Sequence, residues 1–214
     1  MNRKRVAILV SGRGSNMAAL IDAAAEADFP AEIVAVISNR PQAGALAIAA
    51  RAGIASAAID HKAFSSRETF DEALDAELRR HEPDLICMAG FMRLLTPGFI
   101  AKWEGRMLNI HPALLPSFKG LDTHARALEA GVRLHGCTVH LVTAEMDAGP
   151  IVAQAAVPVL DGDDEDALAA RVLKAEHRLY VRALKAFAEG RARLDGGRVV
   201  WDGASDAPEA LVWP

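Results

Sequence analysis

The sequence predicts an α/β fold of the doubly wound class, with a mostly parallel sheet in a Rossmann-like N-terminal half and antiparallel strands in the C-terminal half. Short, almost continuously apolar stretches alternate with helical stretches over about the first hundred residues, and two late apolar stretches are joined by a connection too short for a helix. Buried parallel strands that alternate with helices require helices on both faces of the sheet. The late pair is therefore expected to be antiparallel.

The N-terminal half contains regularly alternating strands and helices. Strands are expected at 5–10, 32–38, 55–60 and 84–90, and helices at 16–27, 43–52, 66–81 and 97–104. Ser65 and Glu68 have the spacing of a capping box for the third helix. Thr96 and Pro97 predict a cap and a first-turn proline for the fourth.

The pattern changes from residue 107 onward. A strand ending at His111 runs into a proline-rich loop, and a short helix is expected near 123–130. The late strands are expected at 135–143 and 151–160, followed by a long helix from residue 163 or 164 to about 189 and a hairpin at 192–202 that turns at Gly196 and Gly197. The tail beyond it has little pattern.

Length, charge and composition restrict the class of protein. The chain has 214 residues, of which 51% are hydrophobic, and this suits one globular domain. A net charge of −4 without a basic tract beyond the first residues argues against a nucleic-acid partner. No apolar run has membrane-spanning length, and the chain starts without a signal peptide, so we expect a cytoplasmic protein.

Cysteine and histidine spacing gives no sign of a metal site. Cys87 and Cys137 lie in apolar strand-like stretches and are expected to be reduced core residues. His135 and His140 are only loosely spaced for metal binding. We predict no metal.

Asn109 and His111 are the first candidate site residues. Side chains alternate between the two faces of a strand, so these polar side chains share one face. Pro112 cannot donate to a sheet ladder and keeps the preceding residue extended, so the strand should end at His111. Ligands bind at the carboxyl edge of open α/β sheets, which makes the pair a candidate site. The alternative is a histidine that merely bonds a neighbouring carbonyl.

The segment 11–16, SGRGSN, joins the first strand to the first helix. Small residues there let backbone N–H groups surround an anion, and the helix dipole favours negative charge, so the segment predicts a phosphate site. Met17 replaces the third glycine of a dinucleotide fingerprint, and the second strand ends without an acidic residue for the ribose. An NADP enzyme that uses Arg40 for a 2′-phosphate remains an alternative, as does a tight turn without a ligand.

Three acidic residues complete the candidate set. Glu145 and Asp147 lie in the turn between the late strands, and a carboxylate there could orient His111 and stabilise its imidazolium. Solvated turn acids are the alternative. Glu176 falls within the apolar stripe of the long helix, so it needs either a basic protein group or the cationic part of a ligand. The stripe consists of Ala169, Val172, Leu173, Leu179, Tyr180, Ala183 and Phe187.

Four motifs together resemble those of the phosphoribosylglycinamide formyltransferases, folate-dependent enzymes of purine synthesis. They are SGRGSN, AGFMRLL, LNIHPALLPSFKG and DAGP, in this order, and the resemblance extends from Val6 to about Phe187. The Asn-x-His and Asp-x-Gly elements are shared by the wider superfamily of 10-formyltetrahydrofolate enzymes. They therefore indicate the chemistry, whereas the phosphate loop indicates the substrate.

The resemblance implies a role for each candidate. The catalytic residues would be Asn109, His111 and Asp147. The phosphate of glycinamide ribonucleotide would be held by Gly14, Ser15 and Asn16, and its amine would lie near Glu176. The folate pocket would be lined by Arg67, Met92, Arg93, Leu94, Leu95 and Asn109. The resemblance also implies the formyltransferase fold as one domain over 1–214, with a phosphate-binding half at 1–105, a catalytic and folate-binding half at 106–190, and a hairpin and tail at 191–214. The implied partners are glycinamide ribonucleotide and the co-substrate 10-formyltetrahydrofolate, without a metal, for a monomer or a homodimer.

The implied reaction needs no covalent enzyme intermediate. An unprotonated amine attacks the formyl carbon on N10 of the folate, while His111 as imidazolium and the Asn109 amide donate to the developing oxyanion. Asp147 keeps His111 charged and helps a water carry the proton from the amine to N10. One alternative is a hydrolase or a formyltransferase for another amine; such enzymes usually have an extra domain, for which the length leaves no room. The other alternative is a non-catalytic folate- or nucleotide-binding module.

Overall fold

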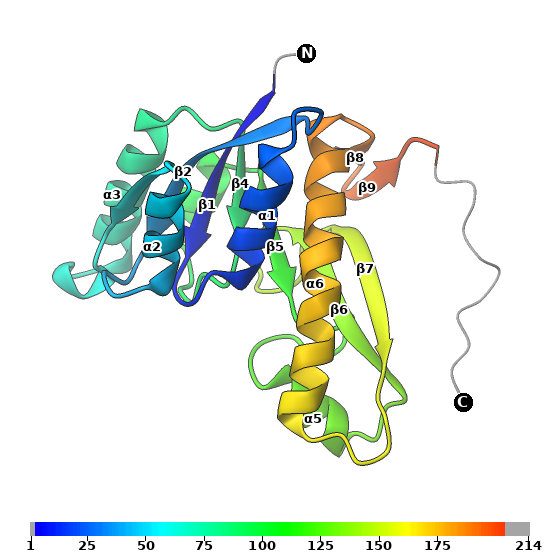
Figure 1. The fold of residues 1–214 in the computed structure, drawn as a ribbon. Coiled ribbons are helices and arrows are strands. Elements are labelled where there is room, and N and C mark those ends of the chain that lie inside the picture. The colour runs from blue at the N-terminus through cyan, green and yellow to red at the C-terminus, as the bar shows by residue number, and fades with distance from the viewer. Residues whose placement is uncertain (1–2, 204–214) are drawn as a thin grey trace. The chain divides into compact units, whose positions relative to one another are not determined.

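The computed structural model describes residues 3–203, which divide into two compact units (Figure 1). The first unit contains the described residues up to Asn109 together with Leu141–Ala144, and the second contains Ile110–His140 and the described residues from Glu145 onward. These units do not correspond to the predicted functional parts, whose boundaries lie at residues 105 and 190, and that division stays a prediction.

The first unit contains the predicted parallel strands. They are β1 (Lys4–Val10), β2 (Ala31–Ser38), β3 (Ala55–Ala58), β4 (Leu85–Met88) and the start of β5 (Met107–His111). Their order is β3-β2-β1-β4-β5, and every neighbouring pair is parallel. The strand order reverses at β1, as expected for a doubly wound fold, and the prediction is confirmed.

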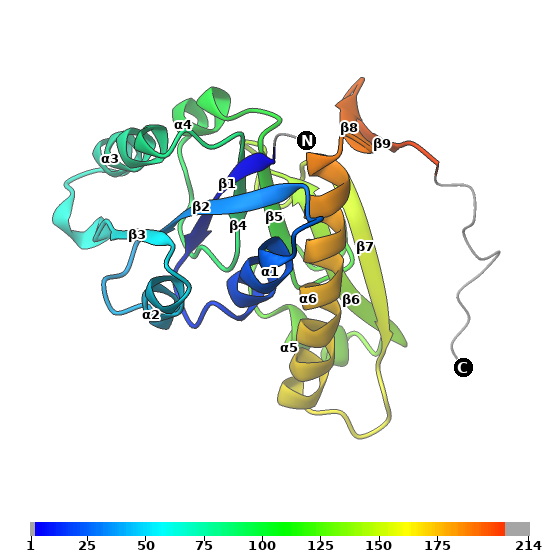
Figure 2. The ribbon, with the colours of Figure 1, turned by 45° about the horizontal axis from the view of Figure 1, so that its top comes forward.

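Helices cover both faces of this sheet (Figure 2). α1 (Ser15–Ala25) and α2 (Gly44–Arg51) lie on one face, and α3 (Arg67–Arg80) and α4 (Pro97–Lys102) on the other; the short 3-10 helix η1 (His61–Ala63) follows β3. Apolar side chains of α3 and α4 pack on those of the sheet to form a core. This core includes Leu9, Ile37, Ile86, Phe70, Leu74, Leu78, Phe99, Ile100 and Trp103.

One of the two predicted helix caps is wrong by a single residue. The N-cap of α3 is Ser66, not Ser65, because Ser66 has the extended conformation and its hydroxyl accepts from the Thr69 N–H at 3.2 Å. Two adjacent serines made the spacing ambiguous. The other cap is confirmed, since Thr96 Oγ1 accepts from the Phe99 N–H at 3.2 Å with Pro97 in the first turn.

The second unit contains the predicted antiparallel pair and the long helix. Its elements are α5 (Thr123–Glu129), β6 (Leu134–Leu141), β7 (Ile151–Pro158), α6 (Glu165–Ala188), β8 (Ala192–Asp195) and β9 (Arg198–Trp201). β6 and β7 are antiparallel, and β8 and β9 form the predicted hairpin around Gly196 and Gly197. The Trp201 indole donates to the Val152 carbonyl at 2.8 Å, which holds the hairpin against β7. The predicted tail lies outside the described residues.

The proline-rich loop that follows β5 is fastened to β6 and β7 by polar side chains. Thr138 Oγ1 donates to the Ala113 carbonyl at 2.7 Å and accepts from the Leu115 N–H at 3.0 Å, and Gln154 Nε2 donates to the Leu115 carbonyl at 2.8 Å. A Cβ atom added to Gly136 would lie 1.9 Å from the Ala155 carbonyl oxygen. Only glycine therefore fits where β6 and β7 come so close.

Two further predictions concern the core and the membrane. Cys87 and Cys137 are buried and free, as predicted. Among residues 3–203, no helix combines the length and the apolar character that crossing a bilayer requires.

Candidate active site

The glycine loop lies in the first unit, between β1 and α1. Gly14 caps α1 with φ of 82°, and an added Cβ would lie 2.7 Å from the Ala45 Cβ and 3.1 Å from the Met17 Cε. Left-handed backbone and lack of space both require glycine here. The cap has no side-chain hydrogen bond, so the first N–H groups of α1 have no acceptor from that residue.

A cavity of about 200 Å³ adjoins this loop. Its lining consists of Gly12, Arg13, Gly14, Ser15, Asn16, Ala89 and Gly90. The three residues predicted to hold phosphate thus share one cavity, together with the Arg13 residue, at the positive end of a helix dipole. This arrangement suits an anion.

The segment 91–95 follows β4 in the same unit. Met92 and Leu94 expose 56% and 58% of their surface, whereas Leu95 is 9% exposed and belongs to the core. The Arg93 guanidinium lies over the Phe70 ring, 4.5 Å from its centroid. Arg67, the first residue of α3, is exposed. Of the predicted folate-lining residues in this unit, Leu95 is therefore the one that is buried.

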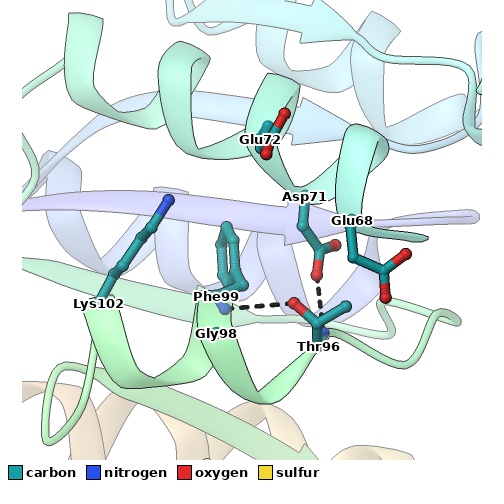
Figure 3. Close-up of a pocket in the computed structure, with 7 residues that line it drawn as sticks. All are labelled: Glu68, Asp71, Glu72, Thr96, Gly98, Phe99 and Lys102. Atoms are coloured by element: carbon teal, nitrogen blue, oxygen red, sulfur yellow. Dashed lines mark hydrogen bonds between the residues drawn. The ribbon is translucent and has the colours of Figure 1, made fainter. Parts of the chain in front are cut away.

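A second cavity, of about 230 Å³, lies between α3 and α4 (Figure 3). It is lined by Glu68, Asp71, Glu72, Thr96, Gly98, Phe99 and Lys102, and includes none of the predicted site residues. Asp71 Oδ2 accepts from the Thr96 N–H at 2.7 Å, and Lys102 Nζ donates to Asp75 Oδ2 at 3.0 Å. These bonds fix the start of α4 and with it the end of the segment 91–95.

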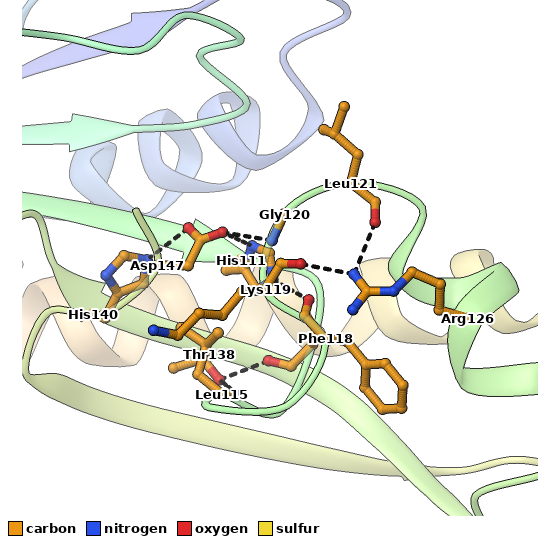
Figure 4. Close-up of polar contacts among 11 residues, drawn as sticks. His111, Leu115, Phe118, Lys119, Gly120, Leu121, Arg126, Thr138, His140 and Asp147 are labelled. Atoms are coloured by element: carbon orange, nitrogen blue, oxygen red, sulfur yellow. Dashed lines mark hydrogen bonds and ion pairs between the residues drawn. The ribbon is translucent and has the colours of Figure 1, made fainter. Parts of the chain in front are cut away.

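The second unit contains a buried cluster around His111 and Asp147 (Figure 4). His111 Nδ1 lies 3.4 Å from Asp147 Oδ2, and His140 Nε2 lies 3.8 Å from Asp147 Oδ1. Asp147 Oδ2 also accepts from the Gly120 N–H at 2.9 Å. His111 and His140 are 5% and 3% exposed. The predicted contact between Asp147 and His111 is confirmed, although residues 111 and 147 come from distant parts of the chain.

His111 is in contact with an oxygen through each ring nitrogen. Its Nε2 lies 3.0 Å from the Phe118 carbonyl, while Nδ1 faces the Asp147 carboxylate. A doubly protonated ring could donate to both oxygens, whereas a neutral ring could donate to only one. The strand-end histidine thus bonds a neighbouring carbonyl through one nitrogen and lies against a carboxylate with the other. Phe118 and Asp147 have positive φ values of 55° and 51°, so each of the two loops that meet at His111, the one after β5 and the one between β6 and β7, has a residue with left-handed backbone.

Asn109 and Glu176 occupy the positions expected from the sequence. Asn109 lies on β5 beside Met88 of β4 and is half-buried. Glu176 is 6% exposed on the apolar face of α6. Burial, followed by the charge of Glu176, raises the pKa of the Cys137 thiol to about 12.

A family model described as formyl transferase matches residues 4–184 of this chain. The chain belongs to the formyl transferase family. It is 44% identical to the phosphoribosylglycinamide formyltransferase of Escherichia coli (strain K12), over 97% of this chain and 98% of that protein. A crystal structure of the phosphoribosylglycinamide formyltransferase from Brucella melitensis matches 87% of this chain and 96% of that one with a TM-score of 0.84 and 61% identity.

Some relatives in the formyl transferase family are much longer. The chain is 49% identical to the trifunctional purine biosynthetic protein adenosine-3 of Gallus gallus over 94% of its own residues. It spans about a fifth, 20%, of the length of that relative.

Sequence reasoning missed three contributors to the cluster around His111 and Asp147. They are the His140 side chain, the Phe118 carbonyl and the Gly120 N–H. His140 could have been found by the argument used for His111, because it also lies close to the end of a strand. The two backbone groups have no sequence signal, since any residue carries them.

A second pair of histidines lies behind Phe118. His135 is 1% exposed and packs edge-to-face against the Phe118 ring at 5.7 Å and the His124 ring at 5.3 Å. Burial, followed by repulsion from His124, lowers the pKa of His135 to about 4, and burial also lowers the pKa of His124. In residues 3–203 no group of three or more His, Cys, Asp or Glu side chains is arranged to hold a metal ion.

Proposed function

We propose that this chain transfers the formyl group of 10-formyltetrahydrofolate to the amine of N1-(5-phospho-D-ribosyl)glycinamide, in purine synthesis. The observation that carries the proposal is the pairing of buried His111 with Asp147 in a formyl transferase chain, and the cavity beside Gly14–Asn16 supports it. Relatives that match nearly their whole length bear the name of this activity. The name of the longer trifunctional relative refers to purine biosynthesis, the process proposed here.

The glycine loop is the proposed phosphate site. The N–H groups of Ser15 and Asn16 follow a glycine cap without a side-chain acceptor, and Arg13 adds a cation to the same cavity. A phosphate monoester fits these features better than a dinucleotide does, because Met17 is buried where the fingerprint requires a third glycine.

His111 and Asn109 are the proposed donors to the formyl oxygen. As the amine attacks the formyl carbon, negative charge develops on that oxygen and is stabilised by positioned donors. Because His111 Nε2 bonds the Phe118 carbonyl at 3.0 Å, the N–H must exchange this carbonyl for the substrate oxygen, or share itself between them. Asp147 keeps hold of Nδ1 during the exchange and helps a water carry the amine proton to N10, whose bond to the formyl carbon breaks as the oxyanion collapses to the new amide.

The remaining roles complete the proposal. Glu176 lies near the substrate amine, and Arg67, Met92, Arg93, Leu94 and Leu95 with Asn109 line the folate pocket, Leu95 from the core side. We also propose a cytoplasmic protein that acts on small molecules rather than nucleic acid, as a monomer or homodimer. Its single domain would keep a phosphate-binding half at 1–105, a catalytic half at 106–190 and a C-terminal segment at 191–214.

One assay tests the activity against its alternatives. The protein is incubated with 10-formyltetrahydrofolate, with and without glycinamide ribonucleotide, and tetrahydrofolate and formylated product are measured. We expect turnover only with the amine present. Equal folate turnover without the amine would indicate a hydrolase, and folate binding without any turnover would indicate a binding module.

A further inference from the structure

Ser11, the first residue of the glycine loop, connects the two loops that follow β1 and β4. Its hydroxyl accepts from the Met92 N–H at 2.7 Å and donates to Asn39 Oδ1 at 2.5 Å. Ser11 and Asn39 are 2% and 1% exposed. One buried hydroxyl therefore uses both its donor and its acceptor capacity to join three chain segments.

Asn39 anchors this connection to the end of β2. It directly follows β2, and its backbone carbonyl lies 2.8 Å from His61 Nδ1 of η1. The neighbouring Ser38 carbonyl accepts from the Ile59 N–H at 2.8 Å. These contacts hold the Asn39 backbone, and its side-chain Nδ2 lies 3.4 Å from His61 Nδ1. A hydrogen bond between neutral groups in such a buried chain is strengthened by its neighbours.

The two loops depend on Ser11 to different degrees. The glycine loop has its own backbone bonds, from the Ser11 N–H to the Gly90 carbonyl at 3.0 Å and from the Ala45 N–H to the Gly12 carbonyl at 3.2 Å. The segment 91–95 has no regular secondary structure, and the Ser11 hydroxyl binds it near its start while Asp71 binds Thr96 just beyond its end. Loss of the hydroxyl should therefore loosen the segment 91–95 and leave the glycine loop in place.

We propose that Ser11 is a positioning residue for the folate-binding segment Met92–Leu95. Through the Ser11 hydroxyl, the phosphate loop and Asn39 hold this segment in the position that the co-substrate requires. This inference rests on the proposed function. It adds to that function a specific link between the loop that takes the amine substrate and the segment that takes the folate. No part of this link was evident from the motifs, because Ser11 and Met92 stand in different ones and Asn39 stands in none.

The first test needs no ligand. Hydrogen–deuterium exchange is measured at the Met92 amide in wild type, Ser11→Ala and Ser38→Ala. Ser38 is a matched control, because it is also a fully buried serine, but its hydroxyl bonds the Arg40 backbone and not the segment 91–95. We expect about fivefold faster exchange in Ser11→Ala, the factor that corresponds to losing a hydrogen bond of typical net strength, and little change in Ser38→Ala.

The second test is kinetic and uses the same variants. Ser11→Ala should raise the KM for 10-formyltetrahydrofolate about fivefold, while the KM for glycinamide ribonucleotide changes less than about twofold. Asn39→Ala should act in the same direction, and the double variant should add little to Ser11→Ala, because both remove one connected bond. Ser38→Ala should keep both KM values.

The outcomes separate the inference from the proposed function. Equal effects of Ser11→Ala and Ser38→Ala on folate KM, or unchanged Met92 exchange in Ser11→Ala, would overturn the inference while the activity stands. A wild-type protein that neither binds nor turns over 10-formyltetrahydrofolate would overturn the proposed function and the inference with it.

Discussion

The glycine loop and the His111 cluster are built in opposite ways. The loop is a continuous stretch of main chain whose shape is set by one left-handed glycine and the start of a helix. The cluster joins His111, Asp147 and His140 with two backbone groups from the proline-rich loop. The first depends on backbone shape and the second on titratable side chains. Single substitutions should therefore affect them differently. A substitution in the loop should lower stability and substrate affinity, whereas one in the cluster should lower the turnover rate.

Removing the charge of Asp147 should have the largest effect. Asp147→Asn keeps an oxygen for the Gly120 N–H but loses the carboxylate that faces His111 Nδ1. We expect the turnover rate near neutral pH to fall about 100- to 10,000-fold, the span for one positioned acid–base group, with much smaller changes in substrate binding. Steady-state kinetics measures this.

Glu145→Gln is the control for Asp147→Asn. Glu145 lies in the same turn, and its carboxylate is exposed and bonds Lys119 Nζ at 3.2 Å. Its variant should keep nearly the full rate. Equal losses in both variants would mean that the turn itself, not the Asp147 carboxylate, matters.

Gly14→Ala should come next and should act on the fold of the loop. A side chain at φ of 82° costs about 1–3 kcal/mol in strain. The overlap with Ala45 adds to this cost, so both the melting temperature and the affinity for glycinamide ribonucleotide should fall. Gly12→Ala is the control for the melting temperature, which it should leave unchanged, because no atom lies within 4 Å of its added Cβ. A Gly14→Ala protein with wild-type melting temperature and affinity would contradict the required geometry.

Glu176→Gln tests whether the buried carboxylate serves the ligand or the fold. We expect the KM for the amine substrate to rise about 10-fold, since one charge-assisted hydrogen bond becomes neutral. The melting temperature should stay close to that of wild type. A large drop in melting temperature with unchanged KM would instead assign Glu176 to the core of the second unit.

His135→Leu should have the smallest effect, confined to the pH dependence of stability. His135 titrates near pH 4 in the folded protein and near its ordinary value of 6.5 when unfolded. Between these values the unfolded chain binds the extra proton, so the free energy of unfolding falls as the pH falls, by at most about 1.4 kcal/mol for each pH unit. His135→Leu removes this contribution. Urea unfolding from pH 7 to pH 4 should show a flatter profile in the variant, and an unchanged slope would refute the assignment.

The sequence predicted those features that local physics determines. Alternating periodicity located the parallel strands and their helices, and proline at residue 112 correctly ended β5 at His111. The α3 cap was placed on Ser65 because spacing alone cannot choose between adjacent serines, whereas the extended backbone of Ser66 decides it.

The candidate site was predictable to the extent that its parts are side chains at strand ends. His111 and Asp147 were found in this way, and their contact is confirmed. The Phe118 carbonyl was not, because a backbone acceptor carries no residue signature and is aimed only by the folded loop. Ser11 was assigned to the phosphate loop alone, since its link to Met92 joins residues that lie 81 positions apart.

Gly136 and Gly14 have unequal prospects under mutational drift. The obstacle beside Gly14 is the Ala45 side chain, so an Ala45→Gly change could make room, although the left-handed backbone would remain costly. The obstacle beside Gly136 is the carbonyl oxygen of Ala155, which every amino acid has. No second substitution can remove it. As long as β6 and β7 pair in this way, no substitution elsewhere can make another residue acceptable at position 136.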